Sequence, residues 1–298
     1  MGVAEGESEI FAPGLLSGQV ALVTGGGTGL GKASVLELVR CGATVVMAGR
    51  REDVLADAAR EIGERCQGGD RSEASERRGR ADWVAGDVRT RAGAEALVRT
   101  VLERYGRLDL LVNNAGGQYF TPAEQIAVKG WRAVWRLNVG GILNMAEVAF
   151  GLAFERGGGG TIVNVTLSPH HGMPGMAHSG SARATVEALT RELAVRWADA
   201  DVVVTAVAAG HFGTEVTAKY PESVRAGAAR SVPLQRLGET QEHAWLVVLL
   251  ASPLGRALNG STVTLDGARD NWFGPWPPAG LADESGQVPM EERRPESS

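Results

Sequence analysis

The sequence is poor in the residues that stabilise disulfide-bonded domains and metal sites. Its 298 residues include two cysteines, Cys41 and Cys66, which have neither metal-ligand spacing nor partners. We expect both on helices, as small apolar side chains of a protein kept in a reducing compartment. The adjacent histidines His170 and His171 lack a third ligand at suitable spacing, so the sequence predicts no metal ion.

Long apolar runs and excess basic charge are also missing. No run of 18 consecutive apolar residues occurs, which argues against a membrane span, and the acidic residues 1–10 lack the apolar core of a signal peptide. The last four residues match no peroxisomal address. The net charge of −5, with no basic face, argues against binding of nucleic acid. We therefore expect a cytoplasmic protein with neither membrane nor nucleic-acid partners.

Short apolar runs alternate with helical patterns from residue 18 to about residue 266. Runs this rich in β-branched residues, joined by helices, are typical of a parallel sheet that is covered on both faces. The pattern predicts an α/β fold: a single doubly wound Rossmann domain with a seven-stranded parallel sheet and a ligand crevice at the carboxyl ends of the strands. The expected strands are Val20–Val23, Thr44–Ala48, Trp83–Ala85, Leu108–Val112, Thr161–Val165, Val202–Val207 and Ser261–Leu265, and the expected helices are 30–41, 52–66, 91–105, 124–155, 177–198 and 239–251.

The expected domain spans residues 15–270. An acidic extension, residues 1–14, precedes it, and a proline-rich tail, residues 271–298, follows it. Within the domain, we expect a polar surface loop at 67–80 and a lid over the ligand at 210–235.

A glycine-rich turn, Thr24–Gly31, follows the first apolar run and leads into the first helix. Strand, glycine turn and helix together let backbone N–H groups and a helix N-terminus bind a pyrophosphate, and glycine is needed where a Cβ would block the approach. The turn therefore predicts a dinucleotide site. The expected contacts are Gly25, Gly27, Thr28, Gly29, Leu30 and Gly31.

The end of the second strand distinguishes NAD from NADP in dinucleotide-binding folds. Arg50 and Arg51 stand there, no carboxylate occupies the turn, and Glu52 is expected to open the next helix. Two guanidiniums suit a 2′-phosphate, so the sequence favours NADP(H). The alternative is that both arginines are solvated loop charges.

Two further strand ends carry polar residues. Asp87 either accepts a hydrogen bond from the adenine amino group or starts a helix ahead of Val88. After the fourth strand, the amides of Asn113–Gly116 satisfy backbone groups beside the cofactor, brace the sheet, or do both. The candidate cofactor contacts at these ends are Asp87, Val88, Asn114, Ala115 and Gly116.

These motifs together resemble one enzyme family. The glycine turn, Asp87–Val88, Asn113–Gly116, Asn138 and Asp266–Gly267 are similar, in order and spacing over residues 15–270, to the short-chain dehydrogenase/reductases. Four segments resemble the branch of peroxisomal trans-2-enoyl-CoA and 2,4-dienoyl-CoA reductases, namely Ala12–Leu16, Asn114–Gln118, Pro122–Glu124 and His178–Arg183. The resemblance implies NADPH-dependent hydride transfer to an enoyl thioester, which is a small-molecule substrate carried on CoA or a carrier protein, and assembly as a homotetramer or homodimer. It also implies that Gly210, Phe212 and Thr214 lie beside the nicotinamide.

The catalytic positions depart from the family pattern. Typical members carry Tyr-x-x-x-Lys on the sixth helix and a Ser thirteen residues before the Tyr, whereas this chain has Ser179, Arg183 and Thr166 there. The resemblance implies that Thr166 orients the substrate, that Arg183 holds the nicotinamide ribose, and that Asn138 holds a water through a helix irregularity or packs. Arg183 cannot donate and regain a proton, because a guanidinium has a pKa above about 12, and Ser179 is a far weaker acid than a phenol.

Histidines and tyrosines around the expected nicotinamide are alternative proton donors. His170, His178 and His211 fall in the two loops and the helix start beside it, although capping of turns or exposure to solvent would also account for them. Tyr119 follows the Asn-Asn-Ala-Gly turn and Tyr220 lies in the lid. Each either faces the substrate or packs at the rim.

The missing Tyr–Lys pair favours reduction of a conjugated C=C bond over reduction of a ketone. Reduction of a ketone needs an acidic side chain beside the carbonyl oxygen. Reduction of a conjugated C=C bond forms an enolate, which needs hydrogen-bond donors at oxygen and can be protonated at carbon. Two alternatives stay open: non-redox chemistry such as cyclisation, dehydration or isomerisation with a structural NADP, or dinucleotide binding without catalysis. Arg225, Arg230 and Arg236 in the lid either meet a CoA group or face solvent.

Overall fold

The computed structural model describes residues 6–66, 79–167, 175–215, 217 and 227–271. Several predicted features lie outside these residues: His170, His171, Tyr220, Arg225, nearly all of the 67–80 loop, part of the 210–235 lid and nearly all of the tail.

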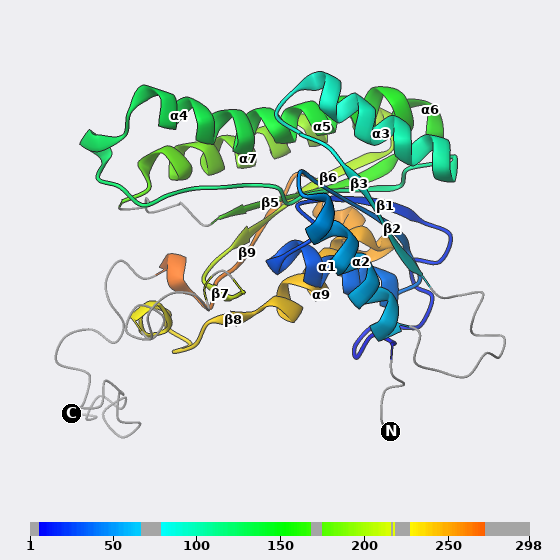
Figure 1. Cartoon of the computed structure of the whole chain (residues 1–298), viewed down its shortest axis with the longest axis horizontal. Helices are drawn as coiled ribbons and strands as arrows, with labels where there is room; N and C mark the ends of the chain where they lie inside the picture. The colour runs from blue at the N-terminus through cyan, green and yellow to red at the C-terminus, as the bar shows by residue number, and fades with distance from the viewer. Residues whose placement is uncertain (1–5, 67–78, 168–174, 216, 218–226, 272–298) are drawn as a thin grey trace, which may run out of the picture.

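The seven expected strands form one sheet in which every pairing is parallel (Figure 1), which confirms the predicted fold. Its order is β3-β2-β1-β4-β5-β6-β9, so the chain reverses direction across the sheet between β1 and β4. Such a reversal leaves a crevice at the carboxyl ends of the strands. The bounds are β1 Val20–Thr24, β2 Thr44–Gly49, β3 Arg80–Ala85, β4 Leu110–Asn113, β5 Gly160–Leu167, β6 Val202–Ala209 and β9 Thr262–Leu265.

Helices cover both faces of the sheet (Figure 1). On one face lie α1 (Gly29–Arg40), α2 (Glu52–Cys66) and α9 (Thr240–Ala251), and on the other lie α3 (Arg91–Tyr105), α7 (Ala177–Arg196) and a long helical run from α4 to α6. Alternate side chains of each strand enter the two cores, as Val45 and Val46 of β2 do. The two cores fix the sheet rigidly and so fix the edge at which the site forms.

The long helical run differs from the single helix that we expected at 124–155. A 3-10 turn, η2 (Ala123–Gln125), precedes it, and the α-helical pieces α4 (Val128–Trp135), α5 (Gly141–Ala149) and α6 (Glu155–Gly157) are joined by two π-helical segments, η3 (Arg136–Gly140) and η4 (Phe150–Phe154). In η3, Asn138 Nδ2 donates to the Val134 carbonyl at 2.8 Å, so a side chain enters the backbone ladder and widens the turn.

The same run, 128–157, has the length and composition of a membrane-crossing helix, but half of its most apolar window is buried in the protein. A core helix of a soluble protein passes the same test.

Two very short strands were not expected. β7 (Phe212–Gly213) pairs with β8 (Gly238–Glu239) in parallel and closes the segment that follows β6. Two residues are too few for an alternating pattern to mark a strand.

Candidate active site

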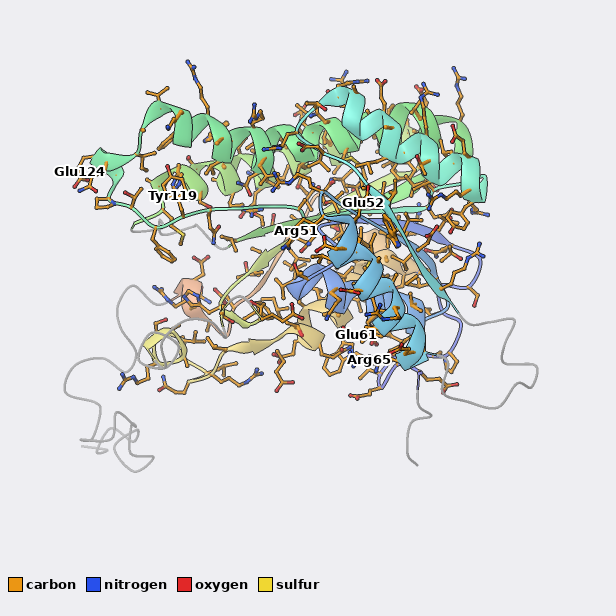
Figure 2. The ribbon with its side chains drawn as sticks, in the orientation of Figure 1. Arg51, Glu52, Glu61, Arg65, Tyr119 and Glu124 are labelled. Atoms are coloured by element: carbon orange, nitrogen blue, oxygen red, sulfur yellow. The ribbon has the colours of Figure 1, made fainter. Side chains whose placement is uncertain are left out.

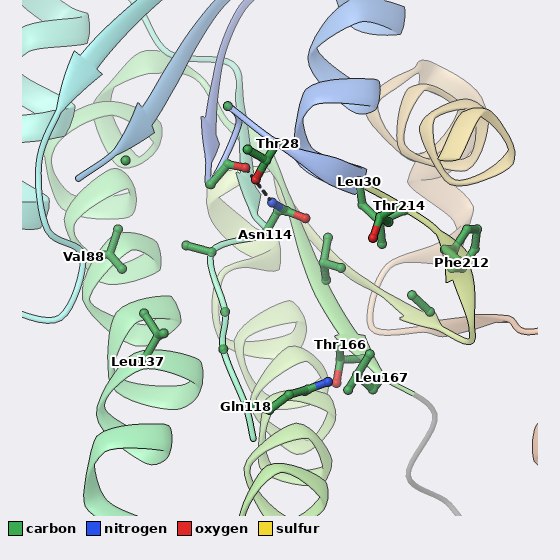
Figure 3. A pocket seen from close by; sticks show the side chains of 18 of the residues that line it. Thr28, Leu30, Val88, Asn114, Gln118, Leu137, Thr166, Leu167, Phe212 and Thr214 are labelled. Carbon is green, nitrogen blue, oxygen red and sulfur yellow. Dashed lines mark hydrogen bonds between the residues drawn. The ribbon is translucent and has the colours of Figure 1, made fainter. Parts of the chain in front are cut away.

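One cleft of about 1230 Å³ opens at the carboxyl ends of the strands. Residues that directly follow or end β1, β2, β3, β4, β5 and β6 all line it, as the reversal of strand order requires. Its volume exceeds the roughly 300–1,000 Å³ of ordinary small-ligand pockets, so the cleft has room for a dinucleotide and a second molecule. Figure 3 shows its lining side chains, from Thr28 on one side to Gln118 and Leu167 on the other.

The glycine turn lies against the cleft in a conformation that only small residues allow. Gly25 and Gly29 have φ of +66° and +53°. A Cβ on Gly31 would lie 2.3 Å from the Gly25 carbonyl oxygen, so α1 could not pack this close to the turn. Thr28, the N-cap of α1, makes no side-chain hydrogen bond to the first turn. The backbone N–H groups of that turn are therefore left for a ligand.

All of the predicted cofactor residues except Gly29 and Gly31 line the cleft. The Asn114 side chain satisfies backbone groups beside the cleft, one of the two roles expected for the amides of this turn. Its Nδ2 donates to the carbonyls of Thr24 and Gly25 at 3.0 and 3.2 Å. Its side chain therefore braces the glycine turn against β4, while its backbone forms part of the cleft wall.

Two arginines lie at the end of the cleft next to β2 and β3. Arg50 and Arg51 are exposed and line it, and Glu52 begins α2 as expected. Figure 2 shows Arg51 at the start of α2, with Glu61 and Arg65 further along that helix. Asp87 is the one carboxylate among the described lining residues.

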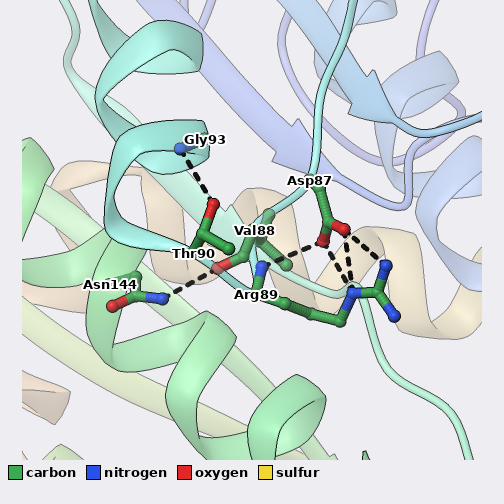
Figure 4. A network of polar contacts seen from close by, with 6 residues as sticks. All are labelled: Asp87, Val88, Arg89, Thr90, Gly93 and Asn144. Carbon is green, nitrogen blue, oxygen red and sulfur yellow. Dashed lines mark hydrogen bonds and ion pairs between the residues drawn. The ribbon is translucent and has the colours of Figure 1, made fainter.

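The Asp87 carboxylate is held by Arg89 (Figure 4), a residue that no sequence motif marks. Arg89 Nε lies 2.9 Å from both carboxylate oxygens, and this ion pair, assisted by Arg50, lowers the pKa of Asp87 to about 2. The N-cap of α3 is Thr90, whose Oγ1 accepts from Gly93 N at 3.1 Å. Asp87 therefore does not start the helix, and it lines the cleft with its carboxylate paired to Arg89.

Arg183 is a buried cation without an ionic partner in the part of the chain that the structure describes. Its Nη1 donates to the Val165 carbonyl at 2.9 Å, its buried Nε has no described partner, and burial lowers its pKa to about 10. A Cβ on Gly116 would lie 2.4 Å from Arg183 Nη2, so the glycine makes room for the guanidinium. Thr166 Oγ1 lines the cleft beside it and donates to the Arg183 carbonyl at 3.3 Å.

Three predicted catalytic residues lie behind the cleft wall rather than on it: Asn138, His178 and Ser179. Asn138 binds the backbone of Gly117 on both sides, with Oδ1 accepting from N at 3.1 Å and Nδ2 donating to O at 2.8 Å. Both polar groups thus hold the 114–118 loop, and Asn138 lies in the helix irregularity η3, so the bound water stays a prediction.

The expectation that His178 donates a proton is corrected by its surroundings. The side chain is fully buried, its ring lies 4.4 Å edge-on from the Tyr119 ring and 6.2 Å from that of Trp131, and neither ring nitrogen has a partner among the described residues. Proton transfer needs hydrogen-bond reach to the reacting group. Tyr119 covers the imidazole and itself lines the cleft, with 41% of its surface exposed.

The Ser179 hydroxyl is also buried, and it donates to Gln118 Oε1 at 3.0 Å. Serine is too short to reach the cleft from this position on α7, so Gln118 occupies the cleft wall in its place. No local sequence pattern links Gln118 to Ser179, because the two residues are 61 positions apart.

The segment after β6 closes the cleft from the other side. Gly210, His211, Phe212 and Thr214 line it. Lys32 of α1 holds this segment through Glu215, with Nζ 3.1 Å from its Oε1, while also pairing with Glu61 of α2 at 2.9 Å. Arg236 does not line the cleft, and it pairs with Glu242 at the start of α9.

The orphaned donors of the cleft fit a nicotinamide dinucleotide. The free N–H groups at the start of α1 suit a pyrophosphate. The Arg183 guanidinium, whose Nη1 binds the Val165 carbonyl and whose Nε has no described partner, suits ribose hydroxyls at the opposite end. Thr214 and Asn114 stand between them on the two walls (Figure 3).

Comparison with known proteins gives consistent matches. The family model described as enoyl-(acyl carrier protein) reductase matches residues 25–268. A peroxisomal 2,4-dienoyl-CoA reductase of Danio rerio, described as (3E)-enoyl-CoA-producing, is 35% identical over 268 residues, which cover 87% of this chain and 84% of that protein. The chain is also similar to a solved structure, the citronellol catabolism dehydrogenase AtuB of Pseudomonas aeruginosa PAO1, at 38% identity and a TM-score of 0.75 over 88% of this chain and 98% of that one.

A second solved structure, the RhlG/NADP active-site complex of Pseudomonas aeruginosa, is 28% identical with a TM-score of 0.76. The match covers 87% of this chain and all of that one.

Proposed function

The chain belongs to the short-chain dehydrogenase/reductase family of oxidoreductases, and from that membership we propose that it is an NADPH-dependent reductase of a conjugated C=C bond in an enoyl thioester. A nicotinamide cofactor, when bound, supplies the hydride. Arg183, Thr214 and the start of α1 would hold it, and Thr166 and Gln118 would face the substrate.

The observation that supports C=C reduction is the buried serine at position 179. Reduction of a ketone forms an alkoxide that must be protonated at oxygen. An acidic side chain placed beside that oxygen raises the rate about 10²–10⁴-fold. Ser179 is buried and its hydroxyl already donates a hydrogen bond to Gln118 Oε1, and Arg183 keeps its proton because its pKa stays near 10. An enolate formed from an enoyl thioester needs only hydrogen-bond donors at oxygen and takes its proton at carbon.

Arg50 and Arg51 support the choice of NADPH over NADH. Both arginines line the end of the cleft beyond β2, and Asp87, the one carboxylate among the described lining residues, is already paired with Arg89. A 2′-phosphate bound there would meet cations, and within the described lining of the cleft no unpaired carboxylate is placed for a 2′-hydroxyl.

The test, on a panel of substrates, is the change in NADPH absorbance, which falls when NADPH reduces an enoyl-CoA, 2,4-dienoyl-CoA or ketone substrate and rises when an alcohol reduces NADP⁺. We expect turnover with the conjugated thioesters and none with ketones. Product formation without cofactor oxidation would instead indicate a cyclase, dehydratase or isomerase, and binding without any turnover would indicate a non-catalytic protein.

The likeness to the citronellol dehydrogenase favours one competing function, oxidation of an alcohol. The panel includes citronellol with NADP⁺ for this reason, and rapid formation of NADPH would replace our proposal. The homo-oligomeric state, the CoA or carrier that bears the acyl group and the cytoplasmic location stay predictions.

A further inference from the structure

His211 is the one histidine among the described residues that lines the cleft. It follows the end of β6, where Ala209 pairs with Leu167, the residue after Thr166 at the end of β5. Neighbouring strands lie about 4.8 Å apart, so a side chain two residues beyond Ala209 lies at the same end of the sheet as Thr166. The imidazole therefore belongs to the part of the cleft that Thr166 and Arg183 line.

The backbone of His211 is held on both sides. Gly210 N donates to the Leu265 carbonyl at 2.9 Å, and the His211 carbonyl accepts from Gly238 N at 2.8 Å. The next side chain, Phe212, is buried against Gly238, where a Cβ would lie 2.6 Å from its ring. Successive side chains of an extended segment point to opposite sides, so the exposed imidazole points to the open side of the cleft while Phe212 anchors the segment.

Two charged side chains that follow β9, Asp266 and Arg269, act on the imidazole. A Cβ on Gly210 would lie 2.5 Å from the Asp266 Cβ, so this glycine lets the end of β6 approach the carboxylate. The Asp266 oxygens accept from two backbone N–H groups of the following turn, at 3.0 and 2.7 Å. The walls of the cleft withdraw part of the ring from water, which lowers the pKa of His211 from its ordinary value of 6.5. Arg269 lowers this pKa further, and Asp266 acts in the opposite direction.

The other titratable residues of the described cleft lining are poor proton donors. The arginines keep their protons, and Asp87 is paired with Arg89 and has a pKa of about 2. Tyr119 carries a phenol, but a Cβ on Gly130 would collide with its hydroxyl, so that oxygen is seated against α4. Within the described lining, His211 is thus the side chain that can give a proton to the cleft near neutral pH.

Building on the proposed function, we propose that His211 is the catalytic acid that protonates the α-carbon of the enolate. Hydride, supplied by the reduced nicotinamide that is oxidised in the step, adds to the β-carbon, and the C=C electrons form the enolate. The enolate then collapses, and its α-carbon forms a bond to a proton of the imidazolium. The electron pair of the broken N–H bond stays on the ring nitrogen, and the exposed neutral ring regains a proton from solvent.

The experiment compares two replacements of His211 with one control. His211→Gln stays polar but does not titrate, and His211→Ala leaves space for an added imidazole. The control is His243→Gln on α9, outside the cleft, because the pKa of His243 is about 4 and its charge does not change over an assay range of about pH 5.5–8.

Each variant is assayed in two ways. The first is oxidation of NADPH with 2-hexenoyl-CoA as a function of pH. The second involves no hydride transfer: in the presence of NADP⁺, the neutral imidazole removes an α-hydrogen of hexanoyl-CoA, and NMR in D₂O follows its replacement by deuterium.

We expect the wild-type kcat to fall as the pH rises through the pKa of His211, because only the imidazolium donates the proton. His211→Gln should lose this dependence, lower kcat on the order of 10²-fold and slow the exchange, while its affinity for NADPH is unchanged. Added imidazole should restore part of the kcat of His211→Ala. His243→Gln should match the wild type in both assays.

The outcomes separate this inference from the proposed function. Full kcat, an unchanged pH profile and full exchange in His211→Gln would overturn the role of His211 while leaving the reductase in place. Exchange that depends on His211, without oxidation of NADPH by the wild type, would support the acid and reject the reductase. A wild type that neither exchanges the α-hydrogen nor oxidises NADPH would reject both.

Discussion

Arg183 has its guanidinium at the reacting end of the cleft, where burial costs free energy that no described counter-ion offsets. We expect Arg183→Met to weaken NADPH binding at least about tenfold, which corresponds to about 1.4 kcal/mol, because a donor to the bound ligand is lost. Arg183→Lys keeps the charge and should bind more tightly than Arg183→Met.

Titration calorimetry with NADPH measures the effect. Arg191→Met, on the exposed side of α7, is the control and should bind like the wild type. Equal affinities for the Arg183→Met and Arg191→Met variants would show that Arg183 does not contact the cofactor.

His243 of α9 links stability to pH. It is fully buried against Ser34, with Nδ1 3.2 Å from the hydroxyl, and burial lowers its pKa to about 4. Between that pH and about 6.5 the unfolded chain binds a proton that the folded chain does not, so the free energy of unfolding falls as the pH drops through this window. At pH 5 this loss amounts to about 2 kcal/mol, at about 1.36 kcal/mol per pH unit below 6.5.

Urea denaturation at pH 7 and pH 5 tests this prediction. His243→Gln should lose less stability than the wild type over that interval, because glutamine does not titrate. Parallel profiles for the two proteins would contradict it.

At the scale of elements, the π-helical segment η3 holds the cleft wall through one side chain, Asn138, which binds the backbone of Gly117. Asn138→Ala should lower the free energy of unfolding by about 1–3 kcal/mol, because the N–H and carbonyl of Gly117 lose their partner. It should also lower kcat, because the loop that carries Gln118 loosens.

Chemical denaturation and steady-state kinetics measure the two effects. Asn144→Ala, which removes a hydrogen bond to the Val88 carbonyl from α5, is the control, and it should leave the reacting end unchanged. Normal kcat in Asn138→Ala would show that the Gly117 contact does not position the loop.

The elements themselves were predictable because short-range patterns define them. The strand at 202–207 is a run of buried residues that are apolar except for Thr205, and the glycine turn has its own spacing, so both were predicted. The π-helical segment η3 contains a side-chain hydrogen bond from Asn138 to Val134, which an apolar pattern does not record, and the pairing of β7 with β8 joins residues far apart in the chain. For the same reason the sequence placed Ser179 and His178 in the site without showing that Gln118 and Tyr119 cover them.

At the scale of the whole molecule, the cleft crosses the edge of the sheet from Arg50 and Arg51 to Gln118, and its walls come from both layers of helices. A ligand that fills it ties these layers together. At a hundredfold excess over Kd, NADPH should add about 2.7 kcal/mol of stability and raise Tm by about 5–10 °C.

NADH, tested at the same concentration, should raise Tm less than NADPH in the wild type. Replacing Arg50 and Arg51 together by alanine should reduce the NADPH shift to that of NADH, whereas Arg60→Ala, which alters an exposed arginine of α2, should not. Thermal unfolding with each cofactor makes the comparison. An unchanged preference in the double variant would show that the arginines are solvated loop charges.

The unmatched donors of the glycine turn and of Arg183 have a consequence for the life of the protein in a cell. The free protein opens more often than the protein that holds a nicotinamide cofactor, and proteases cleave the opened form. Degradation should therefore be fastest when the nucleotide is scarce, so that the standing amount of this polypeptide follows the size of the pyridine-nucleotide pool without any dedicated regulator.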